Sequence, residues 1–191
     1  MGARRGWWVL ALACSACGQV EAPACGAALA CGDVPRHVAP PAHEGCEGLD
    51  PDECLLPWPS SRFLVADATT GTGWRVQLPA DAMPVNVEGV PVSTEAWDRW
   101  DGFSGSTTMM VQLDGPIDAS TLPTWRDPGA SLLPDSPTVV LDADTGERIA
   151  HFAELEPATE ADPRVTLYIR PAARLPDDTH VVVAVRGLSG P

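Results

Sequence analysis

The pentapeptide G-F-S-G-S at residues 102–106 comes closest to a catalytic motif in this chain. An α/β-hydrolase holds its nucleophilic serine in G-x-S-x-G, on a sharp turn between a buried strand and a helix. Here Ser106 takes the place of the last glycine, and a β-like run follows instead of a helix. The downstream histidines that would complete a triad, His151 and His180, both lie within predicted strands. We therefore expect a turn that leads into a strand, with Ser104 not acting as a nucleophile.

The acidic segment D-A-D-T-G-E at residues 142–147 carries oxygen ligands at alternating positions, a pattern that suits calcium. An EF-hand loop also needs ligands further along the chain, ending in a distal glutamate, and here a β-like run begins instead. Thr145 and Gly146 favour a tight turn. The segment is interpreted as the solvated turn of a hairpin, and the sequence predicts no metal and no cofactor.

Three tryptophans, Trp97, Trp100 and Trp125, are candidates for a binding surface because aromatic faces stack on sugar rings. The spacing of three places Trp97 and Trp100 on one side of a short helical turn. Packing of the same side chains onto the folded domain explains this spacing equally well. A glycan- or lipid-binding surface therefore remains an alternative to a purely structural role.

The first 17 residues predict an export signal. A short positive region with two arginines precedes an apolar stretch at residues 7–13, which is too short for a permanent membrane span. A cysteine directly after small residues is typical of bacterial lipoprotein signals, in which that cysteine is acylated. Cys17 is the preferred acylation site and Cys14 the alternative, while cleavage without lipid attachment stays open.

The six cysteines favour disulfides over a metal site. If Cys17 carries lipid, the signal removes Cys14 and an even number remains, which suits two bridges in an oxidising compartment. Of the four remaining cysteines, we expect the first two to close a small loop. We expect the last two to form a bridge at the start of the folded region, and cross-pairing between the two sets stays open. These candidates are Cys25, Cys31, Cys46 and Cys54. The spacing of the first two from the nearby histidines, C-x5-C-x5-H-x5-H, matches no trusted zinc pattern.

Composition narrows the class of protein. The 20 prolines and 17 glycines argue for short strands joined by turns, and 45% apolar residues suffice for a core. Twelve basic residues against 26 acidic ones give a net charge of −14, without any basic cluster. Nucleic-acid binding needs a basic face, so this balance excludes nucleic acid as a partner.

The pattern of apolar residues predicts an all-β fold. Alternating runs occur at residues 74–78, 107–113, 138–141, 148–155, 164–169 and 179–185. The third and fourth of these runs flank the acidic turn and predict a hairpin. Strands with short turns and no intervening helices indicate an antiparallel β-sandwich. We divide the chain into a flexible tether at 18–45, an irregular Pro- and Trp-rich segment at 46–100 and the sandwich at 101–191.

Three segments resemble the bacterial Ig-like domains of secreted proteins. They read P-I-D-A-S-T-L at 116–122, V-V-L-D-A-D-T-G-E-R-I at 139–149 and T-L-Y-I-R-P-A-A-R-L-P-D-D-T-H-V-V-V-A-V at 166–185. His180 stands where that pattern has an aromatic residue. The resemblance implies an Ig-like antiparallel sandwich whose last two strands come from the third segment.

The segment C-L-L-P-W-P-S-S-R-F at 54–63 looks like part of the N-terminal region of large exported bacterial proteins, some of them similar to surface lipases. Ser60 and Ser61 replace the usual Asn-Asp of that family. The resemblance implies a module that precedes an α/β-hydrolase domain in a larger protein. We expect this segment to lie across an end or an edge of the sandwich, where its prolines, which lack an N–H, block further strand pairing.

Together these observations predict a non-catalytic Ig-like module of an exported, lipid-anchored bacterial protein. It would reside at the outer membrane or cell surface and act as a spacer or docking domain, held to the membrane by its N-terminal lipid. The alternative is a glycan- or lipid-binding module that uses its surface tryptophans.

Overall fold

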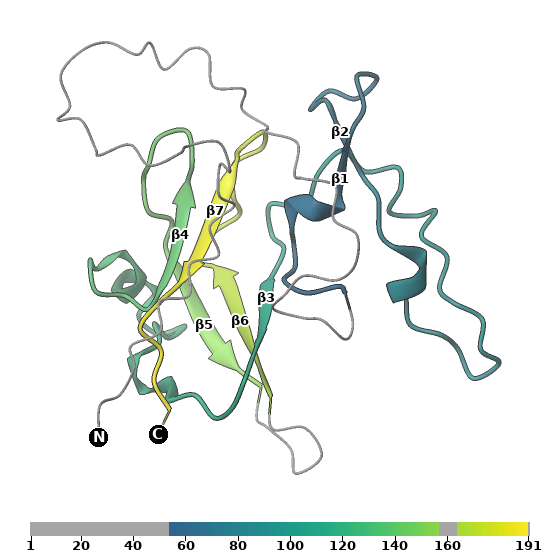
Figure 1. Cartoon of the computed structure of the whole chain (residues 1–191). Coiled ribbons are helices and arrows are strands. Elements are labelled where there is room, and N and C mark those ends of the chain that lie inside the picture. The colour runs from purple at the N-terminus through teal and green to yellow at the C-terminus, as the bar shows by residue number, and fades with distance from the viewer. Residues whose placement is uncertain (1–53, 157–163, 191) are drawn as a thin grey trace, which may run out of the picture.

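The fold is described from a computed structural model, for residues 54–156 and 164–190 (Figure 1). The predicted signal peptide, the tether, Cys14, Cys17, Cys25, Cys31 and Cys46 lie outside these residues. Within the described part of the chain, no helix is long and apolar enough to cross a bilayer.

Residues 54–156 and 164–190 form an all-β structure, with antiparallel strands in three small sheets. The first sheet pairs β1 (Leu64–Ala66) with β2 (Trp74–Val76). The second has the order β3 (Met109–Leu113), β6 (Val165–Pro171) and β5 (His151–Leu155). The third pairs β4 (Thr138–Asp142) with β7 (Val181–Val185). Short 3-10 helices connect them: η1 (Ser61–Phe63), η2 (Ala80–Ala82), η3 (Ala119–Thr121) and η4 (Pro128–Leu132).

The second and third sheets share one aliphatic cluster, which we call the main core. In β6, the inward alternation predicted from sequence is confirmed, because Val165, Leu167 and Ile169 are all buried. Val140 from β4 is also fully buried, so both sheets contribute to the same interior. The remaining buried members of this core are Met109, Val111, Leu122, Ala153 and Val185.

The prediction that the runs at 138–141 and 148–155 form a hairpin is wrong for most of their length. The turn forms as expected: Leu141 bridges Arg148, and the Ile149 N–H donates to the Val140 carbonyl at 2.8 Å. Beyond that point β5 leaves β4 and pairs with β6 along five residues. Alternation predicts that a run is a strand, but packing against the main core decides which sheet it joins.

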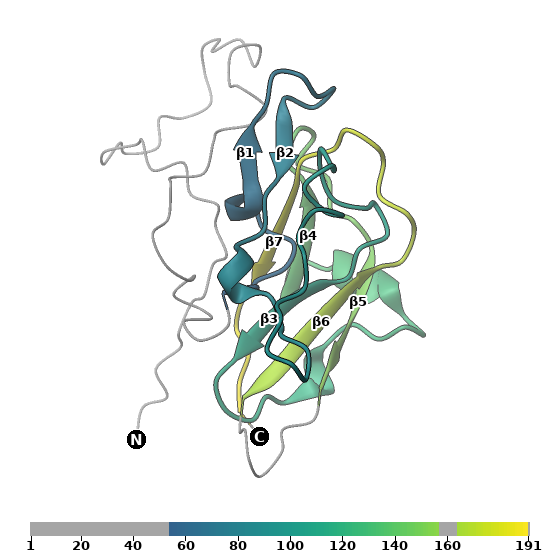
Figure 2. The same cartoon turned by 90° about the vertical axis from the view of Figure 1, so that its right-hand side faces the viewer.

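Residues 54–104 form a smaller lobe with its own apolar cluster, which we call the second core (Figures 1 and 2). Its buried members are Phe63, Val76, Leu78 and Met83. Asp67 closes the turn between β1 and β2 by accepting hydrogen bonds from Thr69 and from the Arg75 guanidinium. The segment that the sequence predicted to be irregular therefore contains a hairpin and a core.

Trp58 joins the two lobes at the free edge of β3. Its N–H donates to the Met110 carbonyl at 2.8 Å, and the Met110 N–H donates back at 2.6 Å. Pro57 and Pro59 flank it and have no N–H, so the pairing stops after one residue. The predicted position of this segment at a sheet edge is confirmed.

Candidate functional site

The G-F-S-G-S segment is a packed turn. The Ser104 side chain accepts a hydrogen bond from the Ser106 N–H at 3.2 Å, and β3 begins a few residues later. A Cβ placed on Gly105 would lie 2.7 Å from the backbone carbonyl oxygen of Leu175. The Leu175 N–H also donates to the Gly105 carbonyl at 2.8 Å. The second glycine of the motif thus serves a close approach between two backbone segments.

His151 is fully buried and both of its ring nitrogens have partners. Nδ1 lies 2.8 Å from the Ile149 carbonyl oxygen, which can only accept, so Nδ1 carries the proton. Nε2 then accepts from the Thr138 hydroxyl at 2.9 Å. Its backbone N–H donates to Ser131 Oγ at 3.0 Å, and this ties η4 to β5.

Burial lowers the pKa of His151 below its ordinary value, and the charge of Arg148 acts in the same direction. The hydrogen bonds at the ring oppose this shift without reversing it. The neutral ring is therefore a structural link between strands and η4, and it does not lie beside Ser104 as a general base.

In the acidic turn at residues 142–147, the Asp142 carboxylate accepts hydrogen bonds from the backbone of the turn itself. Asp142 Oδ1 accepts hydrogen bonds from the N–H groups of Asp144 and Thr145, at 2.8 and 3.1 Å. Gly146 has a φ of 73°, which only glycine adopts without strain. Among the residues that the structure describes, no three His, Cys, Asp or Glu side chains are placed to hold a metal ion.

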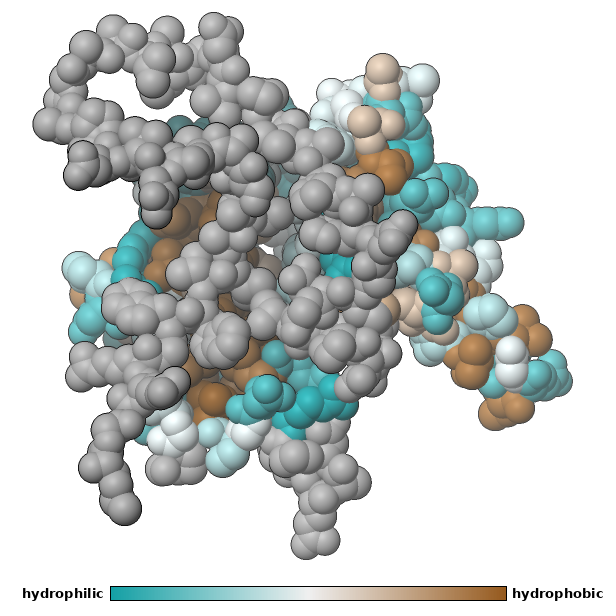
Figure 3. All heavy atoms as spheres, in the orientation of Figure 1, coloured by the Kyte–Doolittle hydropathy of each residue, from teal (hydrophilic) through white to brown (hydrophobic). Residues whose placement is uncertain are grey.

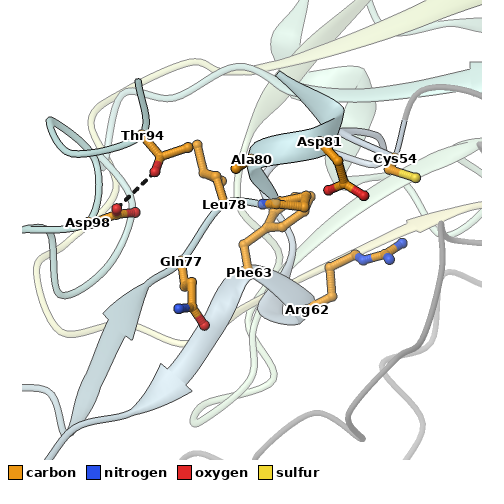
Figure 4. A pocket seen from close by; sticks show the side chains of 10 residues that line it. Cys54, Arg62, Phe63, Gln77, Leu78, Ala80, Asp81, Thr94 and Asp98 are labelled. Atoms are coloured by element: carbon orange, nitrogen blue, oxygen red, sulfur yellow. Dashed lines mark hydrogen bonds between the residues drawn. The ribbon is translucent and has the colours of Figure 1, made fainter. Parts of the chain in front are cut away.

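A cleft of about 590 Å³ opens in the smaller lobe between η1, η2 and the turn at 94–98 (Figure 4). Phe63, Leu78 and Ala80 form its apolar wall. The Thr94 hydroxyl donates to Asp98 Oδ2 at 2.9 Å, whereas Asp98 Oδ1 is buried with no hydrogen-bond partner among the described residues. Its other lining residues are Cys54, Arg62, Gln77, Pro79 and Asp81. The cleft thus combines an apolar wall with a hydroxyl–carboxylate pair, and Ser104 and His151 are not among its lining residues.

Cys54 stands at the rim of this cleft and is disulfide-bonded. Its partner lies outside the described residues, so the alternatives for the pairing stay open. The bond restrains the chain at Cys54, shortly before Trp58, and the pairing of Cys54 with Cys46 stays a prediction.

Of the candidate tryptophans, Trp97 and Trp100 lie side by side, as their spacing predicted, whereas Trp125 lies in the other lobe. Trp97 packs against the second core, and its ring meets Trp100 edge to face at 6.4 Å and 75°. Trp100 is 46% exposed. Trp125 is 63% exposed and lies in the turn before η4, which contacts β4 and β5 of the main core. The Arg126 guanidinium covers one face of the Trp125 ring at 4.9 Å.

Sequence reasoning missed an exposed apolar hairpin at residues 84–92, P-V-N-V-E-G-V-P-V, which we call the valine hairpin. It projects from the smaller lobe, at the lower right of Figure 1, and apolar surface gathers on this projection in Figure 3. Asn86 and Gly89 at its turn, flanked by valines, are the signal that would have found it. Comparisons of the chain with protein family models, with curated proteins and with solved structures found no match.

Proposed function

We propose that the chain is a non-catalytic Ig-like β-sandwich module of an exported, lipid-anchored bacterial protein, acting as a spacer or docking domain. One observation carries this proposal: the candidate catalytic and metal-binding side chains that the sequence singles out make hydrogen bonds that hold the backbone together. Ser104 closes a turn, His151 links η4 to two strands, and Asp142 caps its own turn.

The arrangement of the strands supports an Ig-like sandwich. β4 and β5 follow one another through a tight turn, yet they belong to different sheets that share the main core. Chain crossings between two facing sheets are a regular feature of sandwiches with Greek-key connections. The paired edge at Trp58 then gives the module a defined boundary toward residues 54–104.

The disulfide at Cys54 supports export, because such bonds persist in oxidising compartments. Together with the leader pattern, it favours acylation of Cys17, with Cys14 as the alternative, and a location at the outer membrane or cell surface. The N-terminal lipid is the proposed contact with the membrane.

Two measurements test this function. Mass spectrometry of the N-terminal peptide, taken from the membrane fraction, is expected to show an acylated Cys17. Ester hydrolysis by the purified chain is expected to be absent. Turnover that disappears in Ser104→Ala would overturn the non-catalytic assignment, and an unacylated chain found only in the soluble fraction would overturn the anchor.

A second candidate function, glycan binding, is favoured by one specific contact. Arg126 lies over one face of the Trp125 ring, and the residue is still 63% exposed, so aromatic surface remains accessible for stacking on a sugar. On a glycan array, Trp125→Ala is expected to lose any signal, whereas Trp100→Ala is expected to keep it. A signal that survives Trp125→Ala would exclude this ring as the binding surface.

A further inference from the structure

All four valines of the valine hairpin are exposed to solvent. Val85, Val87, Val90 and Val92 are 62, 105, 55 and 42% exposed. Single apolar side chains on a surface are ordinary, but a contiguous apolar group on a projection marks a site of interaction.

Both faces of the valine hairpin are apolar. Val85 lies opposite Pro91, whereas Val90 and Val92 belong to the next pairs along the ladder, opposite Asn86 and Pro84. Because neighbouring residues of a strand point to opposite faces, Val85 lies on one face and the pair Val90 and Val92 on the other. An occupant therefore has to surround the hairpin, which a fluid apolar medium does more readily than a protein groove.

The backbone of the valine hairpin satisfies most of its own donors. Pro84 and Pro91 have no N–H, and five of the other seven residues donate within the hairpin. Asn86 is central, since its Oδ1 accepts from the N–H groups of both Glu88 and Val90 at 2.9 Å. The donors that no described acceptor takes up are those of Val85 and Val87. Segments that leave water need this internal pairing, because an unpaired N–H in hydrocarbon is costly.

Within residues 76–98, the stretch of sequence that contains the valine hairpin, every charged side chain is acidic. No arginine occurs between Arg75 and Arg99, and the chain has no lysine. Four carboxylates lie in that interval: Asp81, Glu88, Glu95 and Asp98. They disfavour an anionic surface, whereas Glu88 at the turn matches the ammonium group of a zwitterionic headgroup.

We propose that the valine hairpin inserts into the interfacial region of a zwitterionic bilayer. It is a second, weaker contact that orients the module on the membrane. This inference rests on the proposed function in one respect: the N-terminal lipid anchor brings the module close to a membrane. Because one weak insertion gives marginal binding, the hairpin acts together with a tether.

The test holds the full chain on phosphatidylcholine vesicles through an N-terminal hexahistidine tag and a nickel-chelating lipid. This tether replaces the natural anchor, so a failure of acylation leaves the result unaffected. Amide hydrogen exchange of residues 84–92 is followed by mass spectrometry, with and without vesicles. We expect the free N–H groups of Val85 and Val87 to exchange about tenfold more slowly on vesicles.

Variants provide the controls for this experiment. Val87→Ser with Val90→Ser is expected to abolish the slowing, and each variant is also measured without vesicles to correct for loosening of the hairpin. Val65→Ser, at a half-exposed position in β1, is expected to retain it. Equal exchange with and without vesicles would overturn the proposal. Slowing only on anionic vesicles, or only on vesicles that contain membrane proteins, would also overturn it, in the latter case in favour of a protein partner.

Discussion

Trp58 and Met110 exchange both of their backbone hydrogen bonds, at 2.8 and 2.6 Å, across the edge of β3. The Trp58 ring also meets Phe103 edge to face at 5.1 Å and Phe63 at 5.8 Å. One residue therefore joins the strand of the main core to the aromatic side chains of the smaller lobe.

Replacing the Trp58 side chain should loosen the packing of the second core, while both backbone hydrogen bonds to Met110 remain possible. We expect Trp58→Ala to lower the free energy of unfolding by about 2 kcal/mol, because a half-buried aromatic leaves a gap in the second core. Urea denaturation followed by circular dichroism measures the change. Trp125→Ala removes an exposed ring and should cost less than about 0.5 kcal/mol. Equal losses in the two variants would show that Trp58 has no special role.

Gly105 should tolerate no side chain. Gly105→Ala brings a Cβ to 2.7 Å from the Leu175 carbonyl oxygen, and relieving this clash should cost about 1–3 kcal/mol. Gly102→Ala is the matched control, because a Cβ there meets nothing within 4 Å. Thermal unfolding of the two variants compares them directly. If Gly105→Ala is as stable as Gly102→Ala, the close approach is absent in solution.

Stability should fall as pH is lowered through the ordinary range of histidine. The pKa of His151 is lowered in the folded state, so between the two pKa values the unfolded state binds more protons. The contribution of His151 to the free energy of unfolding is therefore fully present above the ordinary histidine pKa of 6.5. Below that pH it declines, by at most about 1.4 kcal/mol per pH unit. Asp67, with a pKa of about 2, stays ionised in this window.

Two measurements check the histidine prediction. Urea midpoints at pH 7.5 and 5.5 give the stability change, and the ring signals in nuclear magnetic resonance give the protonation state. The His151 signals should remain those of a neutral imidazole to a lower pH than the signals of an ordinary histidine. A ring that titrates at the ordinary value in the folded protein would contradict the buried, neutral assignment.

Loss of the disulfide at Cys54 should loosen the smaller lobe first. A disulfide restricts the unfolded chain, and removing one typically costs about 2–5 kcal/mol. Peptide mapping without reductant identifies the partner, for which Cys46 is expected. Cys54→Ser should raise amide exchange in β1 and β2 more than in β6. Uniform exchange across both lobes would show that the bond stabilises the chain as a whole.

Sequence periodicity predicted the strands of the main core well. A buried strand needs every second residue to be apolar, and β3, β6 and β7 carry that pattern without interruption. The edge position of Trp58 was also predictable, because flanking prolines permit little more than one paired residue. These features are local consequences of side-chain and backbone chemistry.

The features that were not predicted depend on contacts between distant residues. The pairing of β5 with β6 follows from the shared core, and alternation alone does not specify it. In the sequence, Gly105 resembles part of a catalytic motif. Only the structure shows that this glycine is needed for the close approach of the Leu175 backbone. Trp97 and Trp100 are both tryptophans and lie three residues apart, so the sequence does not distinguish them. In the structure only Trp97 packs against the second core. The valine hairpin carried a turn signal, but its exposure could be recognised only in three dimensions.

The pairing order of the strands has a consequence for biosynthesis. β3 can pair only after β6 has been synthesised, and β4 only after β7, which ends at Val185. Because each of these strands needs a partner that is synthesised later, the main core cannot assemble until the residues up to Val185 have left the ribosome, whereas β1 and β2 can pair earlier.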